Sequence, residues 1–174
     1  SKLDDDHAAI NAAFMTAGQP APLAWSGLVS LGSVQYSPLW LIYHGETPRT
    51  ELDLFKKKIA IGADNTNTQA LFKTLANRIG YTIDNQPNLL KIKHADAVDQ
   101  FNTNQIDAIF IVDGIESENV QKLLKNPNNK IYDFNLADAY TWQIPYLSKL
   151  TVPKGGLSLQ AVSPREDIHI LATS

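Results

Sequence analysis

The sequence predicts an α/β fold in which one complete lobe, a parallel or mixed sheet with helices on both faces, is joined to part of a second lobe. Between residues 57 and 147, short apolar runs typical of strands alternate with helical patterns. Repeated strand–helix units of this kind indicate a parallel sheet. The run AIFIV at 108–112 is apolar throughout, as is typical of a strand buried on both faces.

The segments on either side of this unit are richer in strands than in helices, and we expect them to be incomplete alone. We therefore predict three parts. Residues 1–54 form a partial first lobe, residues 55–150 form the second lobe as an inserted α/β unit, and residues 151–174 return to the first lobe.

The elements before residue 57 are predicted from alternation and from turn residues. Residues 8–18 indicate a short helix end and a strand, and a Pro- and Gly-rich loop follows at 19–27. The segment 28–45 alternates polar and apolar residues and then becomes fully apolar, which favours one or two strands. Trp40 and Tyr43 are expected in the core. The polar segment 46–55 is predicted to be a connection.

From residue 58 onward, the strand and helix patterns alternate. The helix at 70–79 carries its apolar residues on one face, and Gly80 is the expected stop signal. The other predicted elements are strands at 58–61, 81–83, 106–112, 130–134, 150–153 and 168–173, helices at 94–105 and 116–126, and a helical turn at 136–140.

Charge and residue usage exclude several function classes. The net charge of -3 and the absence of a long basic run argue against a nucleic-acid partner. There is no cysteine, which excludes thiolate metal sites and cysteine nucleophiles. The four histidines have no metal-ligand spacing, and DDDH at 4–7 is interpreted as a solvated tail. Ser158 lacks the strand–turn–helix context of a hydrolase. We expect no metal, no cofactor and no enzyme activity.

The apolar runs are too short for a helix that spans a membrane, which needs about 20 residues. The first ten residues lack the apolar segment of a signal peptide. We expect the chain to be part of a longer protein.

A polar loop at 62–69 separates the strand at 58–61 from the following helix. In a parallel α/β sheet, ligands bind at the carboxyl ends of strands, beside helix N-termini that attract anions. Thr66, Asn67, Thr68 and Gln69 are therefore candidate ligand-binding residues. The alternative is that Asp64, Asn65 or Thr66 only caps the helix.

Two further polar segments are candidates. Asp113 and Ser117 follow the AIFIV strand and are expected at the same edge of the sheet, although Ser117 is also a natural cap for its helix. Ser33 and Tyr36 lie in SLGSVQYSPLW, where polar groups beside an aromatic ring would suit the wall of a binding site.

Five stretches carry a resemblance to a known family. They are SLGSVQYSPLW (30–40), KKIAIGADNTNTQAL (57–71), NQIDAIFIVDGIESENVQKLL (104–124), ADAYTWQIPYLSKLTVPKG (137–155) and SPREDIHILAT (163–173). Together they resemble, in order and spacing, the solute-binding component of TRAP transporters of the TAXI type. The resemblance implies the two-lobed type II periplasmic-binding-protein fold.

The resemblance also implies a function. The chain would capture a small organic carboxylate, of the amino acid or dicarboxylate class, and deliver it to the permease subunits in the membrane. The resemblance also implies a periplasmic or extracytoplasmic location. It further implies that the intact protein can be anchored in the membrane through segments that are absent from this chain, as in some members of the family. Residues 64–69 would hold the carboxylate from the second lobe, Tyr36 and Ser33 would face it, and closure of the lobes would trap it.

The chain departs from the family pattern at two places. Ser37 stands where the family has an acidic residue, and Asn65 and Asn67 stand where its loop has glycines. The identity of the ligand therefore does not carry over. Two alternatives remain open: a ligand-sensing domain of a regulator or receptor on the same fold, and a relative that has lost ligand binding.

Overall fold

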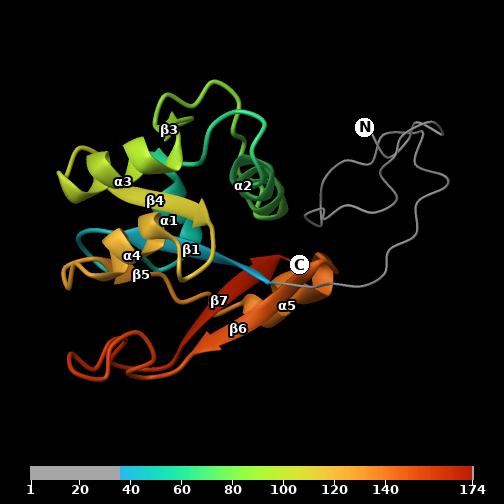
Figure 1. Cartoon of the computed structure of the whole chain (residues 1–174). Helices are drawn as coiled ribbons and strands as arrows, with labels where there is room; N and C mark the ends of the chain where they lie inside the picture. The colour runs from blue at the N-terminus through green and yellow to red at the C-terminus, as the bar shows by residue number, and fades with distance from the viewer. Residues whose placement is uncertain (1–35, 174) are drawn as a thin grey trace, which may run out of the picture.

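The computed structural model describes residues 36–173, which form one mixed seven-stranded sheet with helices on both faces (Figure 1). The predicted α/β class is confirmed. Ser33 and the elements predicted before residue 36 lie outside the described residues.

The elements follow the predicted alternation in most places. The strands are β1 (Ser37–Tyr43), β2 (Ile59–Ala60), β3 (Leu89–Leu90), β4 (Ala108–Val112), β5 (Lys130–Ile131), β6 (Leu147–Val152) and β7 (Ile168–Thr173). The helices are α1 (Glu51–Phe55), α2 (Asn67–Arg78), α3 (His94–Asn102), α4 (Glu118–Leu124) and α5 (Ala137–Gln143).

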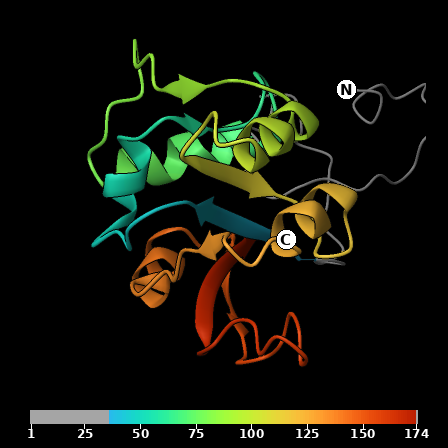
Figure 2. The same cartoon turned by 90° about the vertical axis from the view of Figure 1, so that its left-hand side faces the viewer.

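The sheet has a parallel half and an antiparallel half. Its strand order is β3-β2-β4-β1-β7-β6, and β5 pairs with β1. Strands β3, β2 and β4 run parallel, whereas β1 is antiparallel to β4 and β7, and β7 is antiparallel to β6. Figures 1 and 2 show β6 and β7 projecting from the rest of the sheet as a hairpin.

Each face of the sheet carries its own apolar core because alternate residues of a strand point to opposite faces. On β1, Leu39 and Leu41 join the core that also contains residues of α1, α2 and α5, whereas Trp40 and Ile42 join the core that contains residues of α3 and α4. Trp40 and Tyr43 are buried, as predicted. Helix α2 ends at Arg78 and is followed by Gly80 at φ +73°, which confirms the predicted stop.

Two predictions are wrong. No strand forms at 81–83; the third parallel strand is β3, which pairs with β2 in the register Ile59↔Leu89. The segment 46–55 contains helix α1 instead of being only a connection, and the Asp53 carboxylate accepts a hydrogen bond from the N–H of Thr50. The spacing of Thr50 and Asp53 is that of a capping box, so the signal was present in the sequence.

Tertiary contacts hold this short helix in place. Glu51 is buried on α1, and its carboxylate accepts hydrogen bonds from the hydroxyls of Tyr132 and Tyr140. Burial, followed by the hydrogen bond to Glu51, raises the pKa of Tyr132. A helix of five residues is marginal by itself, so its stability depends on these contacts.

The described parts of the three predicted segments contribute to a single sheet. Strand β1 from the first segment pairs with β4 from the second, and β7 from the third pairs with both β1 and β6. The boundaries of the two lobes, at 54–55 and 150–151, remain a prediction.

Candidate functional site

The strand ends place the predicted site at one edge of the sheet. Strands β2, β3 and β4 are parallel, so the segments that follow them emerge at the same edge. Strand β1 begins at this edge because it runs antiparallel to β4, in the register Leu39↔Val112. The 62–69 loop, the start of α3, the 113–117 loop and Tyr36 therefore all lie near this edge.

A tight turn begins the 62–69 loop. Gly62 has φ +84°, and a Cβ atom built on it would lie 2.8 Å from Cβ of Thr68. Asn65 also has a positive φ, of 63°, which Asn tolerates better than most residues. The turn therefore forms with Asn65 at the position where the family's loop has a glycine.

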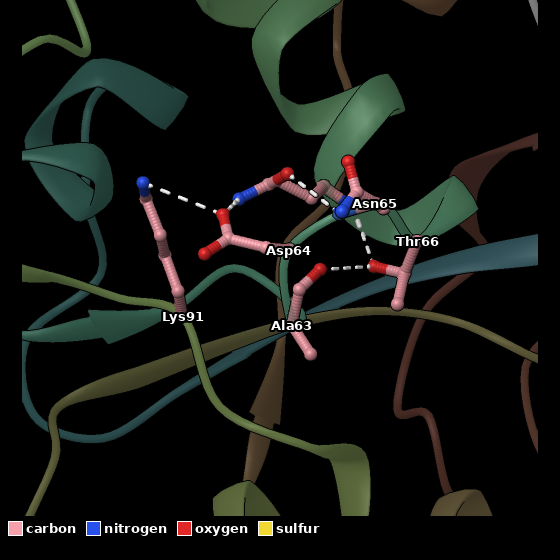
Figure 3. Close-up of polar contacts among 6 residues, drawn as sticks. Ala63, Asp64, Asn65, Thr66 and Lys91 are labelled. Atoms are coloured by element: carbon pink, nitrogen blue, oxygen red, sulfur yellow. Dashed lines mark hydrogen bonds and ion pairs between the residues drawn. The ribbon is translucent and has the colours of Figure 1, made fainter.

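Thr66 caps α2. Its side-chain oxygen accepts a hydrogen bond from the N–H of Gln69 at 3.3 Å and donates one to the carbonyl of Ala63 at 2.7 Å (Figure 3). Of the two interpretations left open by the sequence, the cap is the one that the structure shows.

Gln69 is buried and bridges the loop. Its Nε2 donates to Asp64 Oδ1 at 2.6 Å, and its Oε1 accepts from the N–H of Asn65 at 3.3 Å. The exposed Lys91 lies 3.4 Å from the same Asp64 oxygen (Figure 3). The hydrogen bond from Gln69, followed by the bond and charge of Lys91, lowers the pKa of Asp64. Both polar ends of Gln69 are thus used within the loop.

Thr68 joins three elements. Its side chain is 2% exposed, and its Oγ1 accepts a hydrogen bond from the N–H of Val112 at the end of β4, at 3.3 Å. The same oxygen lies 3.0 Å from Nε2 of His94, the first residue of α3. Thr68 therefore connects the 62–69 loop with α3 and with the end of β4, directly before the 113–117 loop.

Sequence reasoning missed His94 and Lys91. Both follow the short apolar pair Leu89–Leu90, which is β3, and because the strand was predicted at 81–83, the edge position of these two residues was overlooked. Burial lowers the pKa of His94 below its ordinary value, and the charge of Asp113 opposes this shift.

The 113–117 loop is more open. The Asp113 carboxylate accepts a hydrogen bond from the N–H of Gly114 at 2.9 Å. The backbone carbonyl of Asp113 accepts one from Nε1 of Trp40 at 3.0 Å. Ser117 accepts from the N–H of Val120 at 3.2 Å and so caps α4, as the sequence suggested. Ile115 is 42% exposed.

The predicted residues thus fall into two groups. Thr66, Thr68, Gln69 and Ser117 form hydrogen bonds that hold their own segments in place. Tyr36 is 51% exposed and Asn67 is also exposed, so these two can reach a molecule at the edge. Within residues 36–173, no group of three or more His, Asp or Glu side chains is placed to hold a metal ion.

The chain can be compared with known proteins at this point. The model of a family described as the NMT1-like family matches residues 27–173. No curated protein matches the sequence.

Several solved structures resemble the chain in part. The periplasmic aliphatic sulphonate binding protein SsuA from Escherichia coli aligns with 79% of this chain and 36% of its own, with 12% identity and a TM-score of 0.45. The substrate binding protein of an amino acid ABC transporter aligns over 80% and 46%, with 16% identity and a TM-score of 0.37. A Gly52Ala mutant of arginine-bound ArgBP from T. maritima aligns over 56% and 42%, with 17% identity and a TM-score of 0.37.

These TM-scores are too low for the likenesses to carry a conclusion about fold or function. The chain spans less than half the length of each of these proteins. The family match and the mixed sheet support the periplasmic-binding-protein fold predicted from the sequence, whereas the finer assignment to the TAXI type is tested by neither. No helix among the described residues is long and apolar enough to cross a membrane.

Proposed function

The chain belongs to the NMT1-like family, and from this premise we propose that it is part of an extracytoplasmic solute-binding protein that delivers a small molecule to a membrane permease. The family match over residues 27–173 is the observation that carries the proposal. It extends over the sheet and over every loop at the candidate edge.

The finer proposal is that the permease belongs to a TRAP transporter and that the solute is a small carboxylate of the amino acid or dicarboxylate class. This follows from the resemblance to the TAXI type. The edge offers suitable chemistry, because the N-terminus of α2, a helix of 12 residues, favours negative charge.

The residues proposed to contact the solute are the exposed ones. We assign direct contact to Asn67 and Tyr36 because both are exposed at this edge, and a supporting role to Thr66, Thr68 and Gln69, which hold the loop. The Asp113 carboxylate would contact a positively charged part of the solute, such as the ammonium group of an amino acid.

The test is a thermal-unfolding screen of the intact protein against small carboxylates, amino acids, keto acids and phosphorylated metabolites. A ligand at about 100 times its Kd adds roughly 2.7 kcal/mol to the free energy of unfolding, which gives a clear shift. Stabilisation by a carboxylate is the expected result. No shift with any compound would contradict the proposal and favour a relative that has lost ligand binding.

A matched pair of substitutions tests the position of the site. Asn67→Ala at the first residue of α2 is expected to weaken carboxylate binding by roughly tenfold, the loss of one hydrogen bond to a charged group. Asn128→Ala is the control, because Asn128 is also exposed but lies near the opposite edge of the sheet, just before β5. Equal affinity of both variants would place the solute elsewhere.

A further inference from the structure

The side chains of Thr68 and His94 are in contact at the candidate edge of the sheet. These side chains come from the first turns of α2 and α3, and their polar atoms lie 3.0 Å apart. Thr68 is 2% exposed, and its oxygen also accepts the N–H of Val112 from the end of β4. One buried hydroxyl thus ties together the three elements that form the candidate edge.

The hydrogen bonds of Thr68 Oγ1 bear on the protonation state of His94. A backbone N–H can only donate, so Thr68 Oγ1 must be the acceptor toward Val112. The hydroxyl has one proton of its own, and a buried donor without a partner is costly. Nε2 of His94, 3.0 Å away, accepts this proton in one of the two tautomers of the ring. In that tautomer His94 is neutral and carries its proton on Nδ1.

Protonation of His94 breaks this arrangement. In the imidazolium form both ring nitrogens carry hydrogens, so Nε2 no longer accepts the Thr68 proton. Thr68 must then turn its proton away from Nε2 or move. Thr68 lies directly before Gln69, whose side chain bonds to Asp64 and to the N–H of Asn65, so a shift of Thr68 is passed to the 62–69 loop.

Six charged groups lie on the segments around His94, and among them Asp113 acts on its pKa. They are Asp113 and Glu116 after β4, Lys91 and Lys93 before α3, Asp96 on the first turn of α3, and Asp64 in the loop before α2. Asp64 is paired with Lys91. Asp113 favours the charged form of His94, but burial outweighs it and lowers the pKa, in agreement with the neutral state in which Nε2 accepts from Thr68.

We propose that His94 is a positioning residue that holds the 62–69 loop in its binding geometry when neutral and releases the loop when it is protonated. The consequence for binding rests on the proposed function: solute would be held at neutral pH and released as the pH falls. The release of the loop itself does not depend on any solute.

The first test needs no solute. In the intact protein labelled with ¹⁵N-histidine, NMR should show the Nδ1–H tautomer of His94 at neutral pH and a titration midpoint below the ordinary value of about 6.5. The amide signals of Val112 and Gln69 should shift with the same midpoint. An Nε2–H tautomer, or loop amides that do not follow the titration of His94, would overturn the proposal.

Two variants separate this role from simple packing. Thr68→Val removes the hydroxyl but keeps the shape of the side chain, and we expect the His94 midpoint to rise yet stay below the ordinary value, because the neutral ring loses its donor while its burial remains. His94→Gln keeps an acceptor that does not titrate, and we expect the pH response of the loop amides to disappear. A pH response that persists in His94→Gln would also overturn the proposal.

The second test uses succinate and L-glutamate as probes. If either binds, its Kd should increase by up to about tenfold per pH unit below the His94 midpoint, between about pH 8 and pH 5, with a flat profile in His94→Gln. His169→Gln is the control, because His169 lies on β7 and contacts Asp133 instead. Binding that is independent of pH would contradict the inference, whereas no binding at any pH would count against the proposed carboxylate function and leave the NMR result to decide the role of His94.

Discussion

The 62–69 loop and the 113–117 loop leave the same edge of the sheet, and each leads into a helix capped by a hydroxyl. They differ in how they are held. Thr68 and Gln69 of the first are buried and bonded to β4, α3 and Asp64, whereas Ile115 and Glu116 of the second are exposed. The first loop is thus held by buried side chains that contact several elements, whereas the second is tied to β1 only at Asp113 and continues with exposed side chains.

This difference changes how a polar loop should be interpreted. The hydroxyls and amides of the 62–69 loop predicted a ligand site, yet Thr66, Thr68 and Gln69 use their polar atoms to fix the turn. Contact with a solute is what we propose for exposed neighbours such as Asn67. A polar loop at a strand end can therefore provide a rigid support and a binding surface from different residues of the same short segment.

The largest effect is expected at Gly62, the glycine that begins the 62–69 loop. Gly62→Ala places a Cβ 2.8 Å from Cβ of Thr68 at a φ of +84°, so both the backbone and the neighbouring residue are strained. We expect the free energy of unfolding to fall by roughly 2–4 kcal/mol, as measured by denaturant titration.

Gly114→Ala is the matched control. Its Cβ would meet only the end of the exposed Glu116 side chain, which can turn away. A change within about 0.5 kcal/mol is expected. Equal losses at Gly62 and Gly114 would mean that the 62–69 loop is no more tightly held than the other.

Removing the cap residue of either helix should cost less stability than Gly62→Ala, and the two losses should differ by less than those at the two glycines. Ser117→Ala removes one hydrogen bond, to the N–H of Val120, and should cost about 1 kcal/mol. Thr66→Ala also removes the bond to the Ala63 carbonyl, so we expect a larger loss, of roughly 1.5–2 kcal/mol. Thr66→Ser keeps both bonds and should retain most of the stability; a loss as large as that of Thr66→Ala would show that the methyl group, not the cap, is responsible.

The smallest effect on stability is expected for the two exposed ion pairs, Lys91–Asp64 beside the 62–69 loop and Lys122–Glu118 on α4. Lys91→Ala should leave the pKa of Asp64 lowered, because the hydrogen bond from Gln69 is the main cause of the shift. Lys122→Ala should return the pKa of Glu118 to its ordinary range, because the bond and charge of Lys122 cause that shift. Carboxyl ¹³C NMR titration measures both values.

The sign of the pH effect is the same in both regions. A carboxyl whose pKa is lowered by folding contributes stability above its unfolded pKa and loses it as the pH falls through the folded value. Both pairs are exposed, so little change in melting temperature is expected. Full recovery of the Asp64 pKa in Lys91→Ala would show that Lys91, not Gln69, determines it.

Much of the fold follows from local patterns in the sequence. Helix α2 with its stop at Gly80, strand β4, the burial of Trp40 and Tyr43 and the cap at Ser117 were all predicted. Each depends on residues within one or two turns or on the alternation along one strand. Helix α1 also has a local signal in the sequence, the spacing of Thr50 and Asp53.

Other features were decided only by the tertiary structure. The sequence determined that strands and helices alternate and that polar residues follow the strands. It did not determine that β1 lies between β4 and β7, that the third parallel strand is Leu89–Leu90, or that Thr68 meets His94 across 26 residues. The reason is physical: periodicity and capping act over a few neighbouring residues, whereas the partner of a strand edge or of a buried hydroxyl is chosen by how the whole chain packs.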